Sequence, residues 1–309
     1  MRKAKAFAPA AISSFFAIHD TQNGKPISNL EEVGAIGGGF GLRKGVATSV
    51  TIEEAQNNRI DITINSKPAP AKTTRKVAET LLSKTTSKHA VIIEHKIEVP
   101  VGTGFGTSAG GALTTGLALA HALELPLTYN QIGAIAHVAE IECHTGLGTV
   151  SSLTFAGGCP LVVKPGAPGI CVIDRIPLTS NYVVVAGYFK STKSTKTVLS
   201  DPNKKRQINL YGKETLDAIL AKPNLENFLA CCWQFAQNAA FATENVRKFV
   251  DLAKQAGAVG AAQNMIGEAV HAVTSKENTA AVEEAFKQVL PQEQVLVSEL
   301  DFQGARLLT

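Results

Sequence analysis

Residues 100–110 read PVGTGFGTSAG, and they join an alternating stretch, HAVIIEHKIEV, to a run of Ala, Leu, Gly and Thr that begins near Thr107. The alternation predicts a strand, and the apolar run predicts a helix of roughly 16 residues that is buried on several sides. A strand that is followed by a glycine-rich loop and then by the start of a helix favours the binding of an anion at that start. The first N–H groups of a helix lack internal partners, and glycines let the backbone approach a phosphate. A turn that only lets the helix pack closely is the alternative.

Two common nucleotide-binding patterns do not fit this loop. The P-loop pattern requires Lys directly after its last glycine, and Thr107 stands there. The dinucleotide fingerprint requires its third glycine at the same position. If the loop binds phosphate, it therefore does so in a third way.

The composition narrows the classes of protein to consider. The 309 residues leave room for two domains, and 45% hydrophobic residues allow a large core. The net charge of +4 is mild and no helix carries a basic stripe, which argues against nucleic-acid binding. None of the five cysteines forms a CxxC pair, so neither a zinc framework nor a disulfide framework is indicated. With no signal peptide and no membrane-length apolar run, we expect a cytoplasmic protein that does not bind membranes.

Strand and helix patterns alternate in both halves of the chain, which predicts an α+β fold. The Pro/Gly segment KPGAPG at 164–169 is the best boundary, giving domains at 1–168 and 169–309. In the first domain, the Gly-Gly-Gly run at 37–39 and Gly41 predict a break between strands, either a hairpin turn or a loop at a substrate. In the second domain, we predict helices at about 209–221, 224–240 and 243–256.

The loop sequence PVGTGFGTSA resembles the P-x-x-x-G-[LF]-G-[ST]-S-A segment of the GHMP kinase superfamily. FAPAAISSFFAI (7–18), HVAEIECHTGLGTVSSLTFAGG (137–158) and GAAQNMIGEAVHA (260–272) resemble segments of the archaeal pantoate kinases of that superfamily, so the likeness spans most of the chain. It implies the two-domain GHMP kinase fold, with a ribosomal S5 domain 2-like N-terminal domain and a ferredoxin-like C-terminal domain.

The same resemblance implies an activity: transfer of the ATP γ-phosphate to the 4-hydroxyl of pantoate in coenzyme A biosynthesis. A kinase for another small hydroxy acid or alcohol, and a nucleotide-binding relative with little activity, are the alternatives. The small-molecule substrate is the expected partner, and the oligomeric state is open, with a homodimer among the options.

The resemblance also assigns residues to ligands. Ser108 and Glu140 would hold Mg²⁺, and His137 would help to place the substrate. The loop residues expected at ATP are Pro100, Gly102, Thr103, Gly104, Phe105, Gly106, Thr107, Ser108, Ala109 and Gly110. The residues expected at pantoate are Ser13, Gly38, Gly39, Gly41, Arg43, His144, Thr145 and Gly146. Arg43 or Lys44 would attract the pantoate carboxylate, for which an Arg fork is the better match.

The spacing of His137, Glu140 and His144 puts all three on one face of a helix predicted at 131–144. Two histidines and a glutamate can bind zinc, so a zinc site is an alternative. The HExxH spacing is missing and no fourth ligand is visible. Magnesium prefers oxygen ligands, which suits Glu140 and Ser108 better.

Two positions depart from the family pattern. Thr149 stands where the family has Asp after TGLG, and Ala11 stands where it has His. Because Thr149 cannot act as a base, three hypotheses follow: the reaction needs no dedicated base, Glu142 or His144 replaces it, or the protein has little activity. The basic stretch KSTKSTK (190–196) is either a solvated loop or a lid over the triphosphate.

Overall fold

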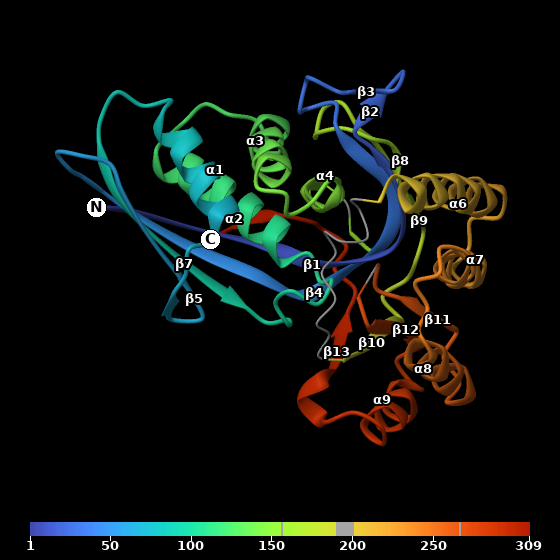
Figure 1. The fold of residues 1–309 in the computed structure, drawn as a ribbon. Helices are drawn as coiled ribbons and strands as arrows, with labels where there is room; N and C mark the ends of the chain where they lie inside the picture. The colour runs from blue at the N-terminus through green and yellow to red at the C-terminus, as the bar shows by residue number, and fades with distance from the viewer. Residues whose placement is uncertain (156, 190–200, 266) are drawn as a thin grey trace.

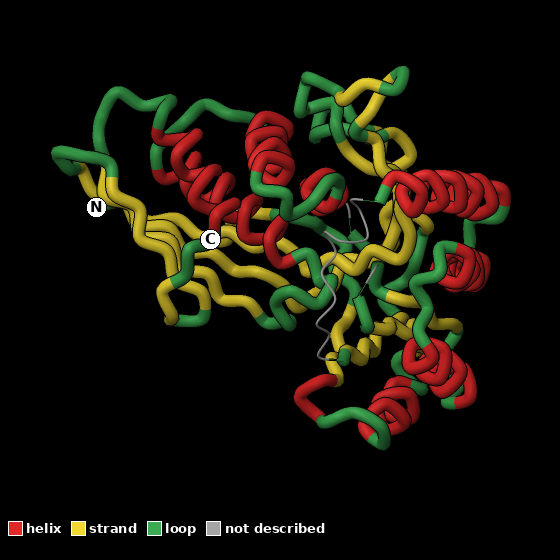
Figure 2. The backbone as a smooth tube through the Cα atoms, in the orientation of Figure 1, coloured by secondary structure: helices red, strands yellow, loops and turns green. Residues whose placement is uncertain are grey.

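The computed structural model describes residues 1–155, 157–189, 201–265 and 267–309. These residues form two β-sheets with helices packed on them, as Figures 1 and 2 show. The predicted α+β class is confirmed. The KSTKSTK stretch, for which we considered a lid, lies outside the described residues.

The first sheet is built around two long antiparallel strands, β1 and β4, and has the order β14-β1-β4-β7-β5-β6, with β8 pairing to β4 and β9 to β8. Its strands are β1 (Arg2–His19), β4 (Gly34–Glu54), β5 (Arg59–Ile64), β6 (Lys67–Pro68), β7 (His89–Ile97), β8 (Cys159–Lys164), β9 (Val172–Ile176) and β14 (Arg306–Leu308). A short hairpin of β2 (Thr21–Gln22) and β3 (Lys25–Pro26) projects beyond it (Figure 1).

Three helices cover one face of this sheet: α1 (Lys72–Leu82), α2 (Thr107–Ala122) and α3 (Tyr129–Glu142) (Figure 1). The short helix α4 (Thr149–Phe155) follows α3. The predicted buried helix is confirmed as α2, whose small residues allow close approach to β1 and β4. A capping box is present at the start of α3, where Thr128 and Gln131 exchange hydrogen bonds.

The second sheet has the order β11-β12-β10-β13 and is antiparallel throughout. Its strands are β10 (Tyr182–Tyr188), β11 (Gly260–Gln263), β12 (Ala269–Ser275) and β13 (Val295–Glu299). The helices of this half are α6 (Pro202–Ala221), α7 (Leu225–Asn238), α8 (Glu244–Gln255) and α9 (Thr279–Lys287), with the 3-10 turn η1 (Gln292–Gln294) before β13. Numbered along the chain, the strands lie in the order 2-3-1-4, with helices after the first and third, which is the ferredoxin-like arrangement that we predicted.

Helix α6 begins at Pro202, earlier than the predicted start near 209. Asp201 caps it by accepting from the N–H groups of Asn203 and Lys204, and Pro202 occupies the first turn, where its missing N–H costs nothing. The basic character of 204–206 hid this start in the sequence.

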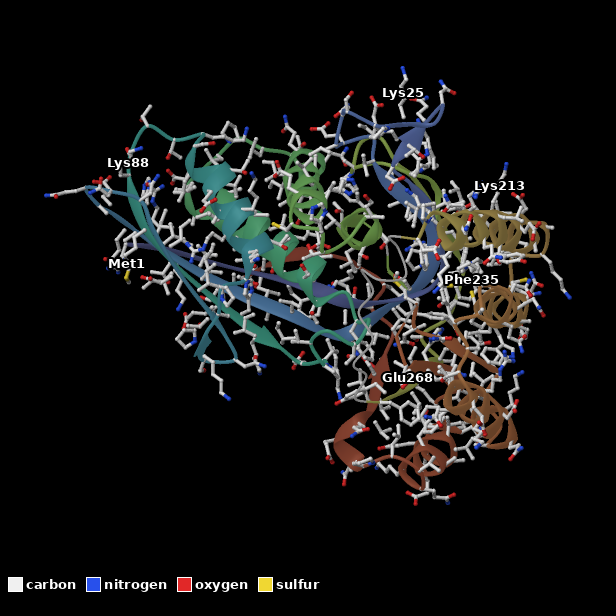
Figure 3. The ribbon with its side chains drawn as sticks, viewed as in Figure 1. Met1, Lys25, Lys88, Lys213, Phe235 and Glu268 are labelled. Atoms are coloured by element: carbon white, nitrogen blue, oxygen red, sulfur yellow. The ribbon has the colours of Figure 1, made fainter. Side chains whose placement is uncertain are left out.

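Aromatic side chains join α7 to the first sheet. Phe15 and Phe16 of β1 meet Phe235 edge-on, and Phe40 of β4 meets Phe228 in the same way. Figure 3 labels Phe235 where α7 faces the strands. These rings form the core between the two halves of the chain.

The glycine run at 37–39, for which we considered a hairpin turn or a substrate loop, lies within strand β4, near its start. Gly37 and Gly39 pair with Phe16 and Ser13 of β1 across a bulge. A Cβ at Gly39 would overlap the carbonyl oxygen of Ile12, so the strands approach more closely here than other residues allow. Glycine is therefore required for strand packing.

Strand pairing does not follow the predicted division at 168/169. β9 lies beyond this boundary and pairs with β8 of the first sheet, and β14 returns to pair with β1. Of the helices in the described parts of the chain, none is both long and apolar enough to cross a membrane.

Candidate active site

A cavity of about 1020 Å³ opens between the two sheets. Its walls come from β1, β4, the loop before α2, the turn between α3 and α4, and the turn between β11 and β12. The predicted site residues in its lining are Ser13, Gly38, Gly39, Gly41, Gly102, Thr103, Gly104, Phe105, Gly106, Thr107, Ser108, Ala109, Glu140, His144, Thr145, Gly146 and Thr149. Pro100 and Gly110 flank the loop outside this lining.

The glycine-rich loop leaves the start of α2 open toward the cavity. Gly102, Gly104 and Gly106 all have positive φ, at 81°, 86° and 62°, which other residues rarely adopt. Gly106 is the N-cap, and no side chain caps the helix there. The N–H of Gly110 makes the first helical bond, to Gly106 O (3.0 Å), so the preceding three N–H groups have no partner within the helix.

Contacts with β1 and with Tyr188 fix the position of the glycine-rich loop. Ala11 N donates to Phe105 O (3.1 Å), and the Phe105 ring is buried, with Tyr188 edge-on to it. The loop is therefore anchored to β1, while its glycine backbone faces the cavity. With no acidic residue in the first turn of α2, this end favours an anion.

Ser108, in the first turn of α2, lies beside a buried carboxylate. Its Oγ donates to Glu140 Oε1 (2.5 Å), and Thr145 Oγ1 donates to the same oxygen (2.6 Å). Glu140 projects from α3, and only 3% of it is exposed. Gly146 makes room for it, because a Cβ there would overlap Glu140 Oε2. Residues from α2, α3 and the following turn thus meet at one carboxylate.

Burial raises the pKa of the Glu140 carboxyl above its usual value, and the hydrogen bonds from Ser108 and Thr145 lower it in part. No Lys or Arg is among the described residues that line the cavity, so no protein cation there offsets the desolvation. A carboxylate in this setting is stabilised by a bound cation.

A fourth oxygen in this cluster comes from α1. Thr73 Oγ1 lies 3.3 Å from Ser108 Oγ and 2.9 Å from Thr145 Oγ1, and the residue is 4% exposed. Sequence reasoning missed Thr73, because a Thr in the first turn of an amphipathic helix has no distinguishing pattern.

His137 does not face the cavity, contrary to our prediction. Its Nε2 lies 2.8 Å from Val33 O, and its Nδ1 lies 3.5 Å from Ser151 Oγ. Burial lowers its pKa, which the hydrogen bond with Val33 offsets in part, and both ring nitrogens lie near protein groups. It ties α3 to the chain just before β4.

Arg43 also lies elsewhere. It forms an ion pair with Glu299 in a separate shallow groove, which Lys44 and Lys276 share. A bulge explains this placement, because Pro9 of β1 pairs with Gly45 and Ala10 with Leu42, so that Arg43 and Lys44 leave the regular pairing of the cavity-lining segment. The structure therefore does not bring Arg43 or Lys44, which we expected at the substrate carboxylate, to the cavity.

Two further hypotheses lose support. Glu142, considered as a base, pairs with Lys76 (3.0 Å) outside the cavity lining. The zinc alternative fails because the described residues include no cluster of three His, Cys, Asp or Glu side chains able to hold a metal ion. Only Glu140 of the proposed zinc trio is central to the site, since His137 is buried in protein contacts and His144 is exposed at the cavity wall.

Thr149, at the start of α4, lines the cavity beside the glycine-rich loop. A Cβ at Gly106 would lie 3.0 Å from both Thr149 Cγ2 and Ala11 Cβ. The two positions that depart from the family pattern therefore face each other across Gly106. Small side chains at both leave this wall apolar.

A buried network that the sequence did not reveal links β1 to the second sheet. Ser14 Oγ lies 2.9 Å from His271 Nε2, and His271 Nδ1 lies 2.8 Å from Asn264 Oδ1. Burial lowers the pKa of His271 to about 3, which keeps the ring neutral. Next to it, Met265 N donates to Ser13 O (2.9 Å). The turn that carries Glu268, labelled in Figure 3, is thereby fixed at the cavity.

Comparison with known proteins gives a consistent result. Residues 72–157 match the GHMP kinases N terminal domain. The pantoate kinase of Methanocaldococcus jannaschii is 30% identical over 271 residues, which cover 88% of this chain and 93% of that protein. The pantoate kinase of Thermococcus kodakarensis is 33% identical over 239 residues, 75% of each chain.

Several solved structures have the same fold as this chain. One described as a phosphotransferase related to the CoA biosynthesis pathway superposes with a TM-score of 0.84 at 26% identity, covering 99% of this chain and 98% of that chain. A homoserine kinase from Cytophaga hutchinsonii gives a TM-score of 0.70 at 16% identity, covering 100% and 98%, which shows the shared fold alone. The chain therefore belongs to the pantoate kinase family of the GHMP kinases.

Proposed function

We propose that this protein is a kinase that transfers the γ-phosphate of ATP to the 4-hydroxyl of pantoate. One observation carries the proposal: Ser108 and Glu140 meet at the open start of α2, in a chain whose family is that of pantoate kinases. The triphosphate would lie along 102–109, where the loop and the first turn of α2 present N–H groups to the cavity.

The donor set of this cluster suits Mg²⁺. Glu140 offers a carboxylate, and Ser108 and Thr145 offer hydroxyl oxygens, with no nitrogen or sulfur ligand among them. We propose that Ser108 and Glu140 hold the ion. When bound, it would neutralise charge on the triphosphate and bridge it to the protein. Burial raises the pKa of Glu140, and a bound cation would offset the cost of charging this buried carboxylate.

The acceptor would lie between β1, β4 and the turn at 144–149. Ser13 and His144 contribute polar groups to this part of the lining. Thr149 cannot remove the proton of the attacking hydroxyl, and Glu142 is paired with Lys76, whereas His144 lines the cavity. We propose a reaction without a dedicated base, in which the loop and α2 position the two reactants, and a loss of turnover in His144→Gln would show instead that His144 is the base. The loose transition state of phosphoryl transfer makes early proton removal unnecessary.

A second candidate is a kinase for a different small alcohol. It is favoured by the lining of the cavity, where no Lys or Arg stands among the described residues to pair with a carboxylate.

The test is an assay of ADP release with Mg²⁺-ATP and a panel of acceptors: pantoate, homoserine, mevalonate, shikimate and glycerol. Phosphorus NMR of the product would confirm a phosphate ester at the 4-hydroxyl. We expect turnover with pantoate well above the rate without acceptor, and its loss in Ser108→Ala. ADP release that is no faster with pantoate than with water alone would reject the pantoate assignment, and turnover with another alcohol would establish the second candidate.

A further inference from the structure

We propose that Thr73 is a positioning residue of the metal–nucleotide site, which holds the hydroxyls of Ser108 and Thr145 so that their oxygens and Glu140 can face a divalent cation. This inference deepens the proposed function and rests on it. It assigns a role in the site to α1, an element that neither the loop motif nor the TGLGT turn includes.

The first step is the position of the hydroxyl. Thr73 Oγ1 lies 3.3 Å from Ser108 Oγ and 2.9 Å from Thr145 Oγ1. The residue is 4% exposed, so water does not compete freely for these bonds. Thr73 lies where α1, α2 and the turn after α3 come together.

The second step concerns the acceptor toward which the Ser108 hydroxyl proton points. In the structure Ser108 donates directly to Glu140 Oε1 (2.5 Å). A cation held between Ser108 and Glu140 requires that the Ser108 proton point elsewhere, because both oxygens must offer lone pairs to the ion. Thr73 Oγ1 is the other acceptor that the structure gives Ser108 Oγ.

The third step closes the chain of donors. A hydroxyl donates one proton and accepts through two lone pairs. Ser108 can therefore donate to Thr73, Thr73 to Thr145, and Thr145 to Glu140 Oε1 at 2.6 Å. Every hydroxyl proton then has an acceptor, while lone pairs of Ser108 and Glu140 are free for the cation. Without Thr73, the Ser108 hydroxyl would continue to donate its hydrogen bond to the carboxylate that should bind the ion.

The neighbouring residue supplies a matched control. Thr74 occupies the same turn of α1 and is 5% exposed, but its hydroxyl lies 3.0 Å from His95 Nε2, toward the sheet and away from Glu140. Replacing either Thr by Val removes one buried hydroxyl and keeps the shape. Only the Thr73 change removes a hydroxyl from the site.

The experiment measures binding without turnover. Calorimetric titrations with a non-hydrolysable ATP analogue, at a series of Mg²⁺ concentrations, give the Mg²⁺ concentration for half-maximal binding. We expect Thr73→Val to raise it about tenfold, the equivalent of one lost hydrogen bond in a charged site. Thr73→Ser, which keeps the hydroxyl, should restore it. Thr74→Val should leave it unchanged, although urea unfolding should show a comparable loss of stability in both Val variants.

Equal shifts in the two Val variants, or no shift in Thr73→Val, would overturn the proposal, because the effect would then be structural. Because no acceptor is present, this result does not depend on the identity of the substrate. If the Thr73 shift is seen but pantoate is not phosphorylated, the assigned substrate fails and the role of Thr73 stands. A wild-type protein whose nucleotide binding ignores Mg²⁺ would overturn both.

Discussion

Acidification should destabilise this protein through a buried histidine that does not line the cavity. His95 of β7 is 3% exposed and lies between two hydroxyls, with Nδ1 2.7 Å from Thr48 Oγ1 and Nε2 3.0 Å from Thr74 Oγ1. Burial lowers its pKa from 6.5 to about 4. The unfolded chain therefore takes up this proton at a higher pH than the folded protein does.

The sign and size of the effect follow from that difference. The stabilisation is present above the unfolded pKa of 6.5, and it is lost as the pH falls toward the folded value of about 4. Each pKa unit corresponds to about 1.4 kcal/mol, so acidification from about pH 7.5 to about pH 5 should remove about 2 kcal/mol through this one side chain.

Urea unfolding at the two pH values, for the wild type and for His95→Gln, isolates this contribution. Gln can still hydrogen bond to both hydroxyls but does not titrate. The free energy of unfolding should fall by about 2 kcal/mol more in the wild type than in the variant. Equal losses in both proteins would refute the reasoning, because the pH dependence would then arise from other groups.

Substitutions at three other places, one with a matched control, test specific placements. Arg43→Ala should leave the KM for the acceptor unchanged in steady-state assays, since Arg43 pairs with Glu299 outside the cavity; a large increase in KM would return Arg43 to the substrate site. Gly39→Ala should cost about 3 kcal/mol or more in urea unfolding, because its Cβ would overlap Ile12 O, whereas Gly41→Ala, with 3.5 Å to its nearest neighbour, should cost much less. Thr149→Asp should leave turnover unchanged or reduced if no base is needed, and a strong rise in kcat would show that the site can still use one.

The sequence was informative where local pattern and function coincide. The loop at 100–110 and the buried helix after it are set by residues close together in the chain, and the structure confirms both. The family and the fold were predictable for the same reason, because their motifs are contiguous segments. The meeting of Ser108 and Glu140 followed from the family likeness, and the structure places them in hydrogen-bond contact.

The predictions failed where a residue's position depends on how segments that are distant in the chain pack together. Arg43 is two residues from the cavity-lining Gly41, so strand alternation alone would put both on one face, but a bulge in the pairing of β1 and β4 places Arg43 at the outer groove. Glycines at 37–39 have the composition of a turn, but they serve a close crossing of β1 and β4. Thr73 and the Ser14–His271–Asn264 network join segments that lie from 35 to 257 positions apart in the chain, and no local pattern marks such contacts.

The return of β14 to the first sheet has a consequence for synthesis. Arg306, Leu307 and Leu308 pair with Phe7, Ala6 and Lys5, which leave the ribosome about 300 residues earlier. Until then this edge of β1 has no β14 to cover it, and an uncovered strand edge is open to pairing with other chains. The nascent protein therefore has an interval of vulnerability that ends only with its last strand. Such distant pairing also predicts slow folding, because closing so long a loop costs entropy before the contacts form.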